Sequence, residues 1–353
     1  MKNIAIFIPT IKPGGAEKQA TLLATLLDGK YHVDMYLNLG MLEPSSQNYD
    51  LIKSSGVVLH PLEGSAFKKL KVLSKSLKDN NVEVLFNYMT HCNVIGYIAG
   101  RRAGVKKIYG GIRSSSMSVH KIILDFIIHN FFSTGTVYNC YSGCQDIGKW
   151  GFRLDKSFVI PNCFPNISPV INRKDKVIKH IVTVGRFVAP KDYETAIKAI
   201  SELKKLRDDF VFDAIGYGEE EEKIRKWIID YEVDDKVIIH IRPNNVQDIV
   251  RDADIYLSTS VYEGTSNSIL EALNWSLPVV ATNVGDNNRL VIDGENGYLH
   301  PIGDFRGIAK SLNTLLGDSL LRNKMGELSN NLLRKQYSTD IFVEQYIKLI
   351  EEE

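Results

Sequence analysis

The sequence predicts an α/β protein with two doubly wound parallel-sheet, Rossmann-like domains that face each other across a cleft. Short apolar runs rich in β-branched residues alternate with segments of helical period along the whole chain. The alternation stops near residues 160–176, where prolines and asparagines replace the periodic apolar residues, and then restarts. We therefore expect an N-terminal domain at 1–165, a linker at 166–178, a C-terminal domain at 179–335, and a C-terminal helix at 336–353 that packs back toward the N-terminal domain.

The expected elements follow from this alternation. In the first domain we expect helices at 15–27 and 66–80 and strands at 4–10, 32–39, 56–62, 82–89, 106–112 and 136–142. In the second we expect strands, each followed by a helix, at 180–187, 210–218, 236–241, 254–260 and 277–283. The last helix should begin at a cap on Thr339 or Asp340. Ligands of doubly wound sheets bind outside the carboxyl ends of the strands, so the site should lie in the cleft, on residues that directly follow strands.

Composition excludes several classes of protein. With 44% hydrophobic and 24% charged residues in 353, the chain is expected to fold rather than remain disordered. A net charge of +1 gives no general attraction for nucleic acid, but residues 1–160 hold 19 lysines and arginines against 11 acidic residues, which favours an anionic surface or substrate there. The four cysteines form no CxxC pair and are expected to be reduced thiols. The apolar runs are too short for a signal peptide or a membrane span.

Glycines and cations follow the first strand of each domain. Gly14 and Gly15 stand between a strand and a helix, where they allow close approach of a ligand to a helix N-terminus, or simply form a flexible loop. Arg186 directly follows a strand and Lys191 precedes a helix, so a guanidinium and an ammonium group meet at one sheet edge. Either cation alone is equally well explained as a solvated loop residue, whereas the pair indicates a diphosphate site.

Two glutamates flank a hydroxyl-rich helix start, in VYEGTSNSILEALN. Glu263 and Glu271 are eight positions apart, about 12 Å along a helix, so they do not form a paired acid and base. Glu263 is expected in the loop and Glu271 inside the helix, with an anion-binding helix N-terminus between them. Ser268 and Glu271 also fit a capping box, in which the glutamate only fixes the helix start. Spacing leaves both interpretations of Glu271 open.

His91 and Arg113 each follow a strand of the first domain. Both lie at the edge expected to face the cleft. A histidine in this position is either a catalytic group or a residue that hydrogen-bonds at the helix start. Arg113 is a candidate to bind an anionic acceptor.

Taken in order, these motifs resemble the family-4 glycosyltransferases of GT-B architecture (glycosyl transferases group 1). The resemblance covers nearly the whole chain and is most specific from VGRFVAPK through AIGYGEE, E-x7-E and PVVAT to GENGYL. It implies a retaining, metal-independent enzyme with no cofactor, in which Glu263 and His91 lie at the reacting sugar and Glu271 bonds the ribose. The remaining donor-binding residues that it implies are Gly15, Arg186, Lys191, Gly216, Gly218, Arg242, Thr265, Ser266 and Asn267.

The chain departs from the family pattern at several positions. The family's E-G-F-P-N is Glu263 to Asn267 with Thr265 and Ser266 in place of Phe and Pro, and its A-C-G is Asn274 to Ser276. The family's aspartate after I-P-N is missing from IPNCF. Serine and threonine preserve hydrogen bonding at their positions, whereas the donor-sugar pocket is expected to differ from that of the family.

The function predicted from the resemblance is transfer of a sugar from a nucleoside diphosphate sugar, with a UDP-sugar as the expected donor, to a glycan or lipid-linked glycan acceptor in surface polysaccharide synthesis. A nucleotide-sugar epimerase on the same fold and a catalytically silent nucleotide-sugar-binding subunit are the alternatives. We expect a cytoplasmic protein without nucleic-acid partners. Five lysines on the helix expected at 66–80 suggest peripheral contact with an anionic membrane, or alternatively a solvated helix face.

Overall fold

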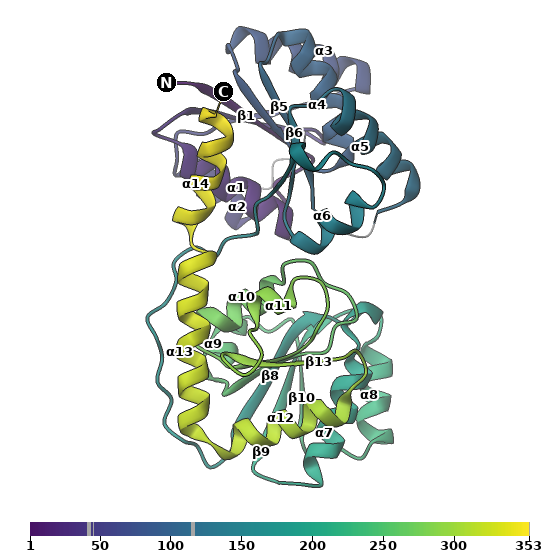
Figure 1. The fold of residues 1–353 in the computed structure, drawn as a ribbon, viewed down its shortest axis with the longest axis vertical. Helices are drawn as coiled ribbons and strands as arrows, with labels where there is room; N and C mark the ends of the chain where they lie inside the picture. Colours follow the sequence, from purple (N-terminus) through teal and green to yellow (C-terminus); the bar gives the residue numbers. More distant parts are fainter. Residues whose placement is uncertain (41–43, 45, 114–116, 353) are drawn as a thin grey trace. The chain divides into compact units, whose positions relative to one another are not determined.

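The computed structural model describes residues 1–40, 44, 46–113 and 117–352 of the chain. Its contacts divide the chain into two compact units. Unit 1 comprises Met1–Cys163 and Thr339–Glu353, and unit 2 comprises Phe164–Ser338. Each unit is a parallel sheet covered by helices (Figure 1).

Among its described residues, unit 1 contains a seven-stranded sheet in the order β3-β2-β1-β4-β5-β6-β7. Its strands are β1 Asn3–Ile8, β2 His32–Leu37, β3 Val58–Pro61, β4 Val84–Asn87, β5 Lys107–Ile112, β6 Gly135–Tyr138 and β7 Ser157–Val159. Its helices are α1 Gly15–Leu27, α2 Gln47–Lys53, α3 Ala66–Asp79, α4 Thr90–Ala103, α5 Val119–Phe131, α6 Tyr141–Gly148, the 3-10 turn η1 Leu154–Lys156, and α14 Thr339–Glu351.

Both faces of the unit 1 sheet are covered by apolar side chains. Helices α1, α2 and α14 pack against one face, and α3 and α4 against the other. The near-continuous apolar sequence of β1 follows from this double coverage, because strands of a parallel sheet are buried on both sides. Helix α14 contributes Phe342, Tyr346 and Ile350 to the core that includes β1 and β4.

Unit 2 contains, among the residues described, a six-stranded sheet in the order β10-β9-β8-β11-β12-β13. Its strands are β8 Lys179–Arg186, β9 Phe210–Tyr217, β10 Val237–Ile241, β11 Ile255–Ser258, β12 Val279–Thr282 and β13 Gly297–His300. Its helices are η2 Ala189–Lys191, α7 Tyr193–Lys204, α8 Glu221–Asp230, α9 Val246–Asp252, α10 Asn267–Asn274, α11 Asn287–Leu290, α12 Phe305–Gly317 and α13 Ser319–Gln336. Helices α7, α8 and α12 cover one face and α9, α10, α11 and α13 the other.

Two strands were not predicted, and several predicted strands extend past the observed ones. Strands β7 and β13 lie at sheet edges and are mostly half-exposed, so their short sequences lack a strong apolar pattern. The strand expected at 136–142 ends at Tyr138, because Tyr141 already begins α6.

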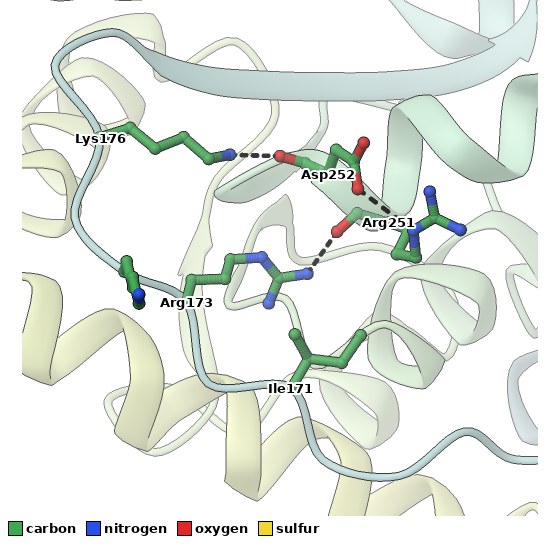
Figure 2. A pocket seen from close by; sticks show the side chains of 6 residues that line it. Ile171, Arg173, Lys176, Arg251 and Asp252 are labelled. Atoms are coloured by element: carbon green, nitrogen blue, oxygen red, sulfur yellow. Dashed lines mark hydrogen bonds and ion pairs between the residues drawn. The ribbon is translucent and has the colours of Figure 1, made fainter.

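The segment expected as a linker, 166–178, lies within unit 2 and packs along it. The Arg173 guanidinium donates to the carbonyl oxygens of Trp275 at 2.6 Å, Arg251 at 2.8 Å and Ser276 at 2.9 Å. Figure 2 shows Arg173 and Lys176 reaching the carbonyl oxygens at the end of α9. Burial lowers the pKa of Arg173 to about 10. Hydrogen bonds from its side chains hold the segment in place. It therefore needs no periodic apolar pattern and has the composition of a loop.

Every helix among the described residues is either too short or too polar to span a lipid bilayer.

Candidate functional site

The strand order of unit 2 creates a switch point between β8 and β11. From β8 the chain proceeds to β9 and β10 on one side, and from β11 it proceeds to β12 and β13 on the other. Because every pairing is parallel, the carboxyl ends of all these strands lie at one edge. Ligands of open α/β sheets bind at such a point, where the two loops diverge and leave space between them. Arg186 ends β8, and the loop that carries Glu263 follows β11.

An ion pair joins the two loops at this point. The Lys191 Nζ atom lies 2.5 Å from Glu263 Oε1, and the Ser260 hydroxyl donates to the same oxygen at 2.8 Å. The side chains retain 26% and 13% exposure, so the pair remains accessible to a ligand. Both residues were predicted from the sequence but not as a pair, and Ser260, the last residue of the strand expected at 254–260, was not predicted.

Further hydrogen bonds make the two loops a single support. The Val261 amide donates to the Pro190 carbonyl oxygen at 2.9 Å. The Thr259 hydroxyl donates to the carbonyl oxygens of Asp192 at 2.9 Å and Lys191 at 3.1 Å. The position of Lys191 is therefore fixed from both sides of the switch point.

Arg186 provides a second cation at the same edge. Its side chain is exposed and makes no hydrogen bond or ion pair with any residue that the structure describes. A guanidinium group in this state can bind an anion without first breaking an internal contact. Together Arg186 and Lys191 form the cationic end of the site.

Glu271 lies in the second turn of α10 rather than at its start. Helix α10 begins at Asn267, and its N-cap residue Ser266 forms no side-chain capping hydrogen bond. Ser268 is therefore the second residue of the helix, so the capping box considered from the sequence is not formed. The partly buried Glu271 and Glu263 both lie near the Tyr256 hydroxyl: burial raises the pKa of Tyr256, and the charges of these two carboxylates raise it further.

The residues between the two glutamates form the helix start. Thr265 and Ser266 are buried, whereas Asn267 is exposed. The Thr265 hydroxyl lies 3.5 Å from Asp286 Oδ2, which ties the loop to the segment after β12. The N-terminus of α10 therefore carries partial positive charge beside the exposed Asn267, which suits an anion or sugar hydroxyl groups.

Glycines allow three backbone segments to pass close together at this edge. A Cβ atom on Gly216 would overlap the Gly185 carbonyl oxygen, and one on Gly218 would overlap the Phe187 carbonyl oxygen. Gly285 has a φ of +55°, and a Cβ atom there would overlap the carbonyl oxygen of Glu263. No role was predicted for Gly285 from the sequence, although it lies against the Glu263 backbone and permits its position.

Arg242 follows β10 at the same edge as these glycines. Its guanidinium group lies 4.1 Å from the centre of the Tyr217 ring, and both side chains are exposed. A cation stacked on an aromatic ring is held in place while its edges stay free for hydrogen bonds. The structure therefore brings Arg186, Lys191, Gly216, Gly218, Arg242, Glu263 and Glu271 to one edge of unit 2.

The three candidates of unit 1 lie at the corresponding edge of the other sheet. Its switch point lies between β1 and β4. Gly15 is the exposed first residue of α1, which follows β1, and His91 is the second residue of α4, which follows β4. His91 and Arg113 line an open pocket of about 470 Å³ together with Ala16, the neighbour of Gly15.

His91 does not tie down the helix start. Its exposed side chain makes no hydrogen bond with any described residue, and the N-cap of α4 is Met89. The start of α4 is held instead by a buried hydrogen-bond network that was not predicted from the sequence. In it, the Asp125 carboxylate accepts from Thr90 Oγ1 at 2.6 Å and from Asn93 Nδ2 at 2.8 Å. The sequence feature that could have indicated this network is Asp125, a charged residue that interrupts an otherwise apolar helix.

An Asp-x-Asp sequence, Asp252-Ala253-Asp254, precedes β11 and so lies at the opposite edge of the sheet from the site. The Arg251 side chain pairs with Asp252 at 3.1 Å, and Lys176 pairs with the buried Asp254 at 3.2 Å. Within the described residues, no group of three histidine, cysteine or acidic side chains is arranged to hold a metal ion.

Comparison with known proteins agrees with this geometry. Residues 166–331 match the family model "Glycosyl transferases group 1". An uncharacterized glycosyltransferase of Haemophilus influenzae is 23% identical over 98% of this chain and 99% of its own length. The lipopolysaccharide core biosynthesis glycosyltransferase LpsE of Rhizobium meliloti is 28% identical, but the match spans only 48% of this chain and 49% of LpsE.

A third relative and one solved structure extend the comparison. The UDP-Gal:alpha-D-GlcNAc-diphosphoundecaprenol alpha-1,3-galactosyltransferase of Escherichia coli is 24% identical over 79% of this chain and 80% of its own length. The crystal structure of Anabaena Alr3699/HepE in complex with UDP superposes with a TM-score of 0.84 over 100% of both chains, at 16% identity. Residues 166–331 therefore match a glycosyl transferases group 1 domain, and the two parallel-sheet units have the GT-B fold.

Proposed function

We propose that the protein is a family-4 retaining glycosyltransferase that moves a sugar from a UDP-sugar to a glycan or lipid-linked glycan acceptor in surface polysaccharide synthesis. The observation that carries the proposal is the Lys191–Glu263 ion pair beside the unpaired Arg186 at the switch point of unit 2. Two cations at a sheet edge suit a diphosphate, and the adjacent carboxylate suits the hydroxyl groups of the attached sugar.

Each residue at this edge has a distinct task in the proposed reaction. Arg186 and Lys191 bind the diphosphate and stabilise the negative charge that it gains as the glycosidic bond breaks. Glu263 accepts hydrogen bonds from the donor sugar, and the backbone amides at Thr265 to Asn267 bind the sugar and phosphate. Glu271, one turn further along, accepts from the ribose hydroxyls, and Arg242 lies where the base would stack. These roles require no metal ion or cofactor, which is part of the proposal.

The names of similar proteins support the choice of donor and acceptor. The Escherichia coli relative is named for a UDP-galactose donor and a lipid-linked diphosphate acceptor, and the Anabaena structure contains UDP. LpsE is named for lipopolysaccharide core synthesis. A nucleotide-sugar epimerase would share the donor site but release a rearranged sugar without an acceptor. A silent binding subunit would bind the donor and neither transfer nor rearrange the sugar.

The test is binding and turnover with a panel of nucleotides. Thermal stabilisation by UDP should exceed that by ADP or GDP, because a ligand that binds only the folded state raises the melting temperature. Arg186→Ala should retain the ligand-free melting temperature, since its side chain is exposed and unpaired, and lose transfer by roughly 10²-fold or more. Arg225→Ala, which removes an exposed arginine on α8, is the matched control. Near-normal transfer by Arg186→Ala would refute the proposal, and a rearranged donor without acceptor would identify the epimerase.

We further propose peripheral attachment to the cytoplasmic face of a membrane through unit 1. Helix α3 presents the exposed lysines Lys68, Lys71, Lys75 and Lys78. Helix α5 presents an exposed apolar row, with Val119 at 55%, Ile123 at 49%, Ile127 at 41% and Phe131 at 68% exposure. Basic and apolar surfaces on one unit are the combination that binds an anionic leaflet reversibly.

A further inference from the structure

The pocket of unit 1 is lined by cationic and neutral residues. It lies at the carboxyl ends of β1, β4 and β5, has a volume of about 470 Å³, and is large enough for a monosaccharide with a charged substituent. Its charged or titratable lining side chains, among the residues described, are Arg113, Lys121 and His91, and no aspartate or glutamate lines it. Lys121 and His91 are exposed at its rim.

Arg113 is incompletely paired although its head group is buried. Its Nη2 atom donates to the Tyr346 hydroxyl at 2.8 Å, and the guanidinium carbon lies 4.2 Å from the centre of the Tyr88 ring. Its Nε and Nη1 atoms are buried and have no hydrogen-bond partner among the residues that the structure describes. A buried guanidinium group with two free donors and no carboxylate is costly unless a ligand pairs with it.

The buried carboxylate of Asp125, on α5, does not neutralise the charge of Arg113. Both oxygens of Asp125 accept hydrogen bonds from Thr90 and Asn93, whose side chains fix the start of α4. The two tyrosines hold the guanidinium plane but contribute no negative charge. Arg113 is therefore oriented by its neighbours while its charge remains unmatched.

The starts of three helices add to the positive potential of the pocket. Ala16 is the second residue of α1, Thr90 the first of α4, and Ser118 the N-cap of α5, and all three line the pocket. The N-terminus of a helix carries partial positive charge and unpaired amides, which favour an anion.

We propose that this pocket binds the oxyanion of an acidic acceptor, a phosphate ester or a carboxylate, with Arg113 as the guanidinium donor and Lys121 as the second cation at the rim. The acceptor class is then a phosphorylated or uronic-acid-bearing sugar rather than a neutral glycan. The identity of the bound anion as the acceptor rests on the proposed transferase function, whereas its binding to unit 1 can be measured without any turnover.

The experiment measures binding of small probes to the full chain by saturation-transfer NMR. The background variant Arg186→Ala/Lys191→Ala removes the cations of the unit 2 site. Glucose 1-phosphate, glucuronate and methyl glucoside represent the phosphate, the carboxylate and the neutral sugar. We expect glucose 1-phosphate or glucuronate to bind at least about tenfold more tightly than methyl glucoside, and the tighter of the two identifies the source of the oxyanion.

Substitution of residues that line the pocket tests whether the anionic probe binds there. Lys121→Ala changes an exposed side chain and should weaken binding of the anionic probe several-fold without altering the melting temperature. Arg113→Lys keeps one charge but loses the fork, and should weaken it about tenfold. Arg101→Ala, which removes an exposed arginine near the end of α4, is the control. Equal binding of methyl glucoside, or unchanged anion binding in both Lys121→Ala and Arg113→Lys, would overturn the proposal. If the wild-type protein has no transferase activity but anion binding still depends on Lys121 and Arg113, the proposed function is refuted and the assignment of the pocket stands.

Discussion

The Lys191 ammonium group lies 2.5 Å from the Glu263 carboxylate, across the point where the strand order of unit 2 reverses. The two residues are 72 positions apart and come from loops after different strands. In the proposed function this pair provides a cation for the diphosphate of the donor and an anion for the hydroxyl groups of its sugar. Its partial exposure means that it contributes little to folding stability, so its removal should be visible in binding rather than in stability.

Replacing either member of the pair should separate binding from turnover. Lys191→Ala should weaken UDP binding by roughly 10- to 100-fold, because a charged hydrogen bond to the diphosphate is lost. Glu263→Gln keeps a hydrogen-bonding group beside Ser260 and should retain UDP affinity while transfer falls. Calorimetric titration with UDP and steady-state rates provide the two measurements. Lys198→Ala, which breaks a lysine–glutamate pair on α7, is the control, and wild-type UDP affinity in Lys191→Ala would contradict the assignment.

Gly216→Ala should destabilise unit 2 by about 2 to 4 kcal/mol. Its Cβ atom would overlap a backbone oxygen of the neighbouring strand, which cannot move without disturbing the β8–β9 pairing. Gly317→Ala at the end of α12 is a suitable control, since its Cβ atom would have a nearest neighbour at 3.7 Å, the end of a flexible arginine. Urea unfolding of both variants is the measurement. Equal stability of the two would show that the close approach at Gly216 is not required.

Stability should depend on pH through His180. Its Nδ1 atom lies 2.7 Å from Asp213 Oδ2, while His240 Nε2 lies 2.7 Å from the other oxygen of the same buried carboxylate. The hydrogen bond with Asp213 raises the pKa of His180 above its ordinary 6.5, although burial and the charge of Lys176 oppose this. Burial opposes ionisation of Asp213, yet the hydrogen bonds with His180 and His240 leave its pKa below the ordinary value. The carboxylate therefore stays charged at the pH values where His180 titrates.

A histidine with a raised folded-state pKa stabilises the protein fully below its unfolded-state pKa, and this contribution is lost as the pH rises through the folded-state value. The free energy of unfolding of the wild type should therefore fall, relative to that of His180→Asn, between about pH 6 and pH 8. Urea unfolding at stepped pH measures the difference. A difference that is constant, or that grows with pH, would show that the pair does not titrate in this way.

Flotation with liposomes should distinguish the two surfaces of unit 1 proposed for membrane contact. With phosphatidylglycerol liposomes, Lys68→Ala/Lys71→Ala/Lys75→Ala should weaken binding by roughly 10²-fold, since each lysine near an anionic leaflet contributes about 1 kcal/mol. With the same liposomes, Ile123→Asn/Phe131→Ser should weaken binding by removing the apolar row of α5. Lys226→Ala on α8 is the control in unit 2. A wild-type protein that stays at the bottom of the gradient would remove the membrane proposal.

The sequence alone determined the fold class and the positions of most elements. The apolar runs that became β1 and β8 carry their own signal, because a strand buried on both faces must be apolar at nearly every position. The same runs also placed Arg186, Glu263 and His91 at or after the carboxyl ends of strands. Resemblance to a known family then gave these positions chemical roles, which remain predictions for this chain.

Tertiary structure decided which of these residues meet. Whether Lys191 pairs with Glu263 depends on β11 lying beside β8, and strand order is not written in the periodicity of either segment. The same holds for Glu271, whose place in the second turn depends on where α10 begins, and for Arg113, whose partner Tyr346 is 233 residues away. Periodicity records which face of a strand or helix is buried, whereas contacts between distant residues arise only when the complete set of elements has packed.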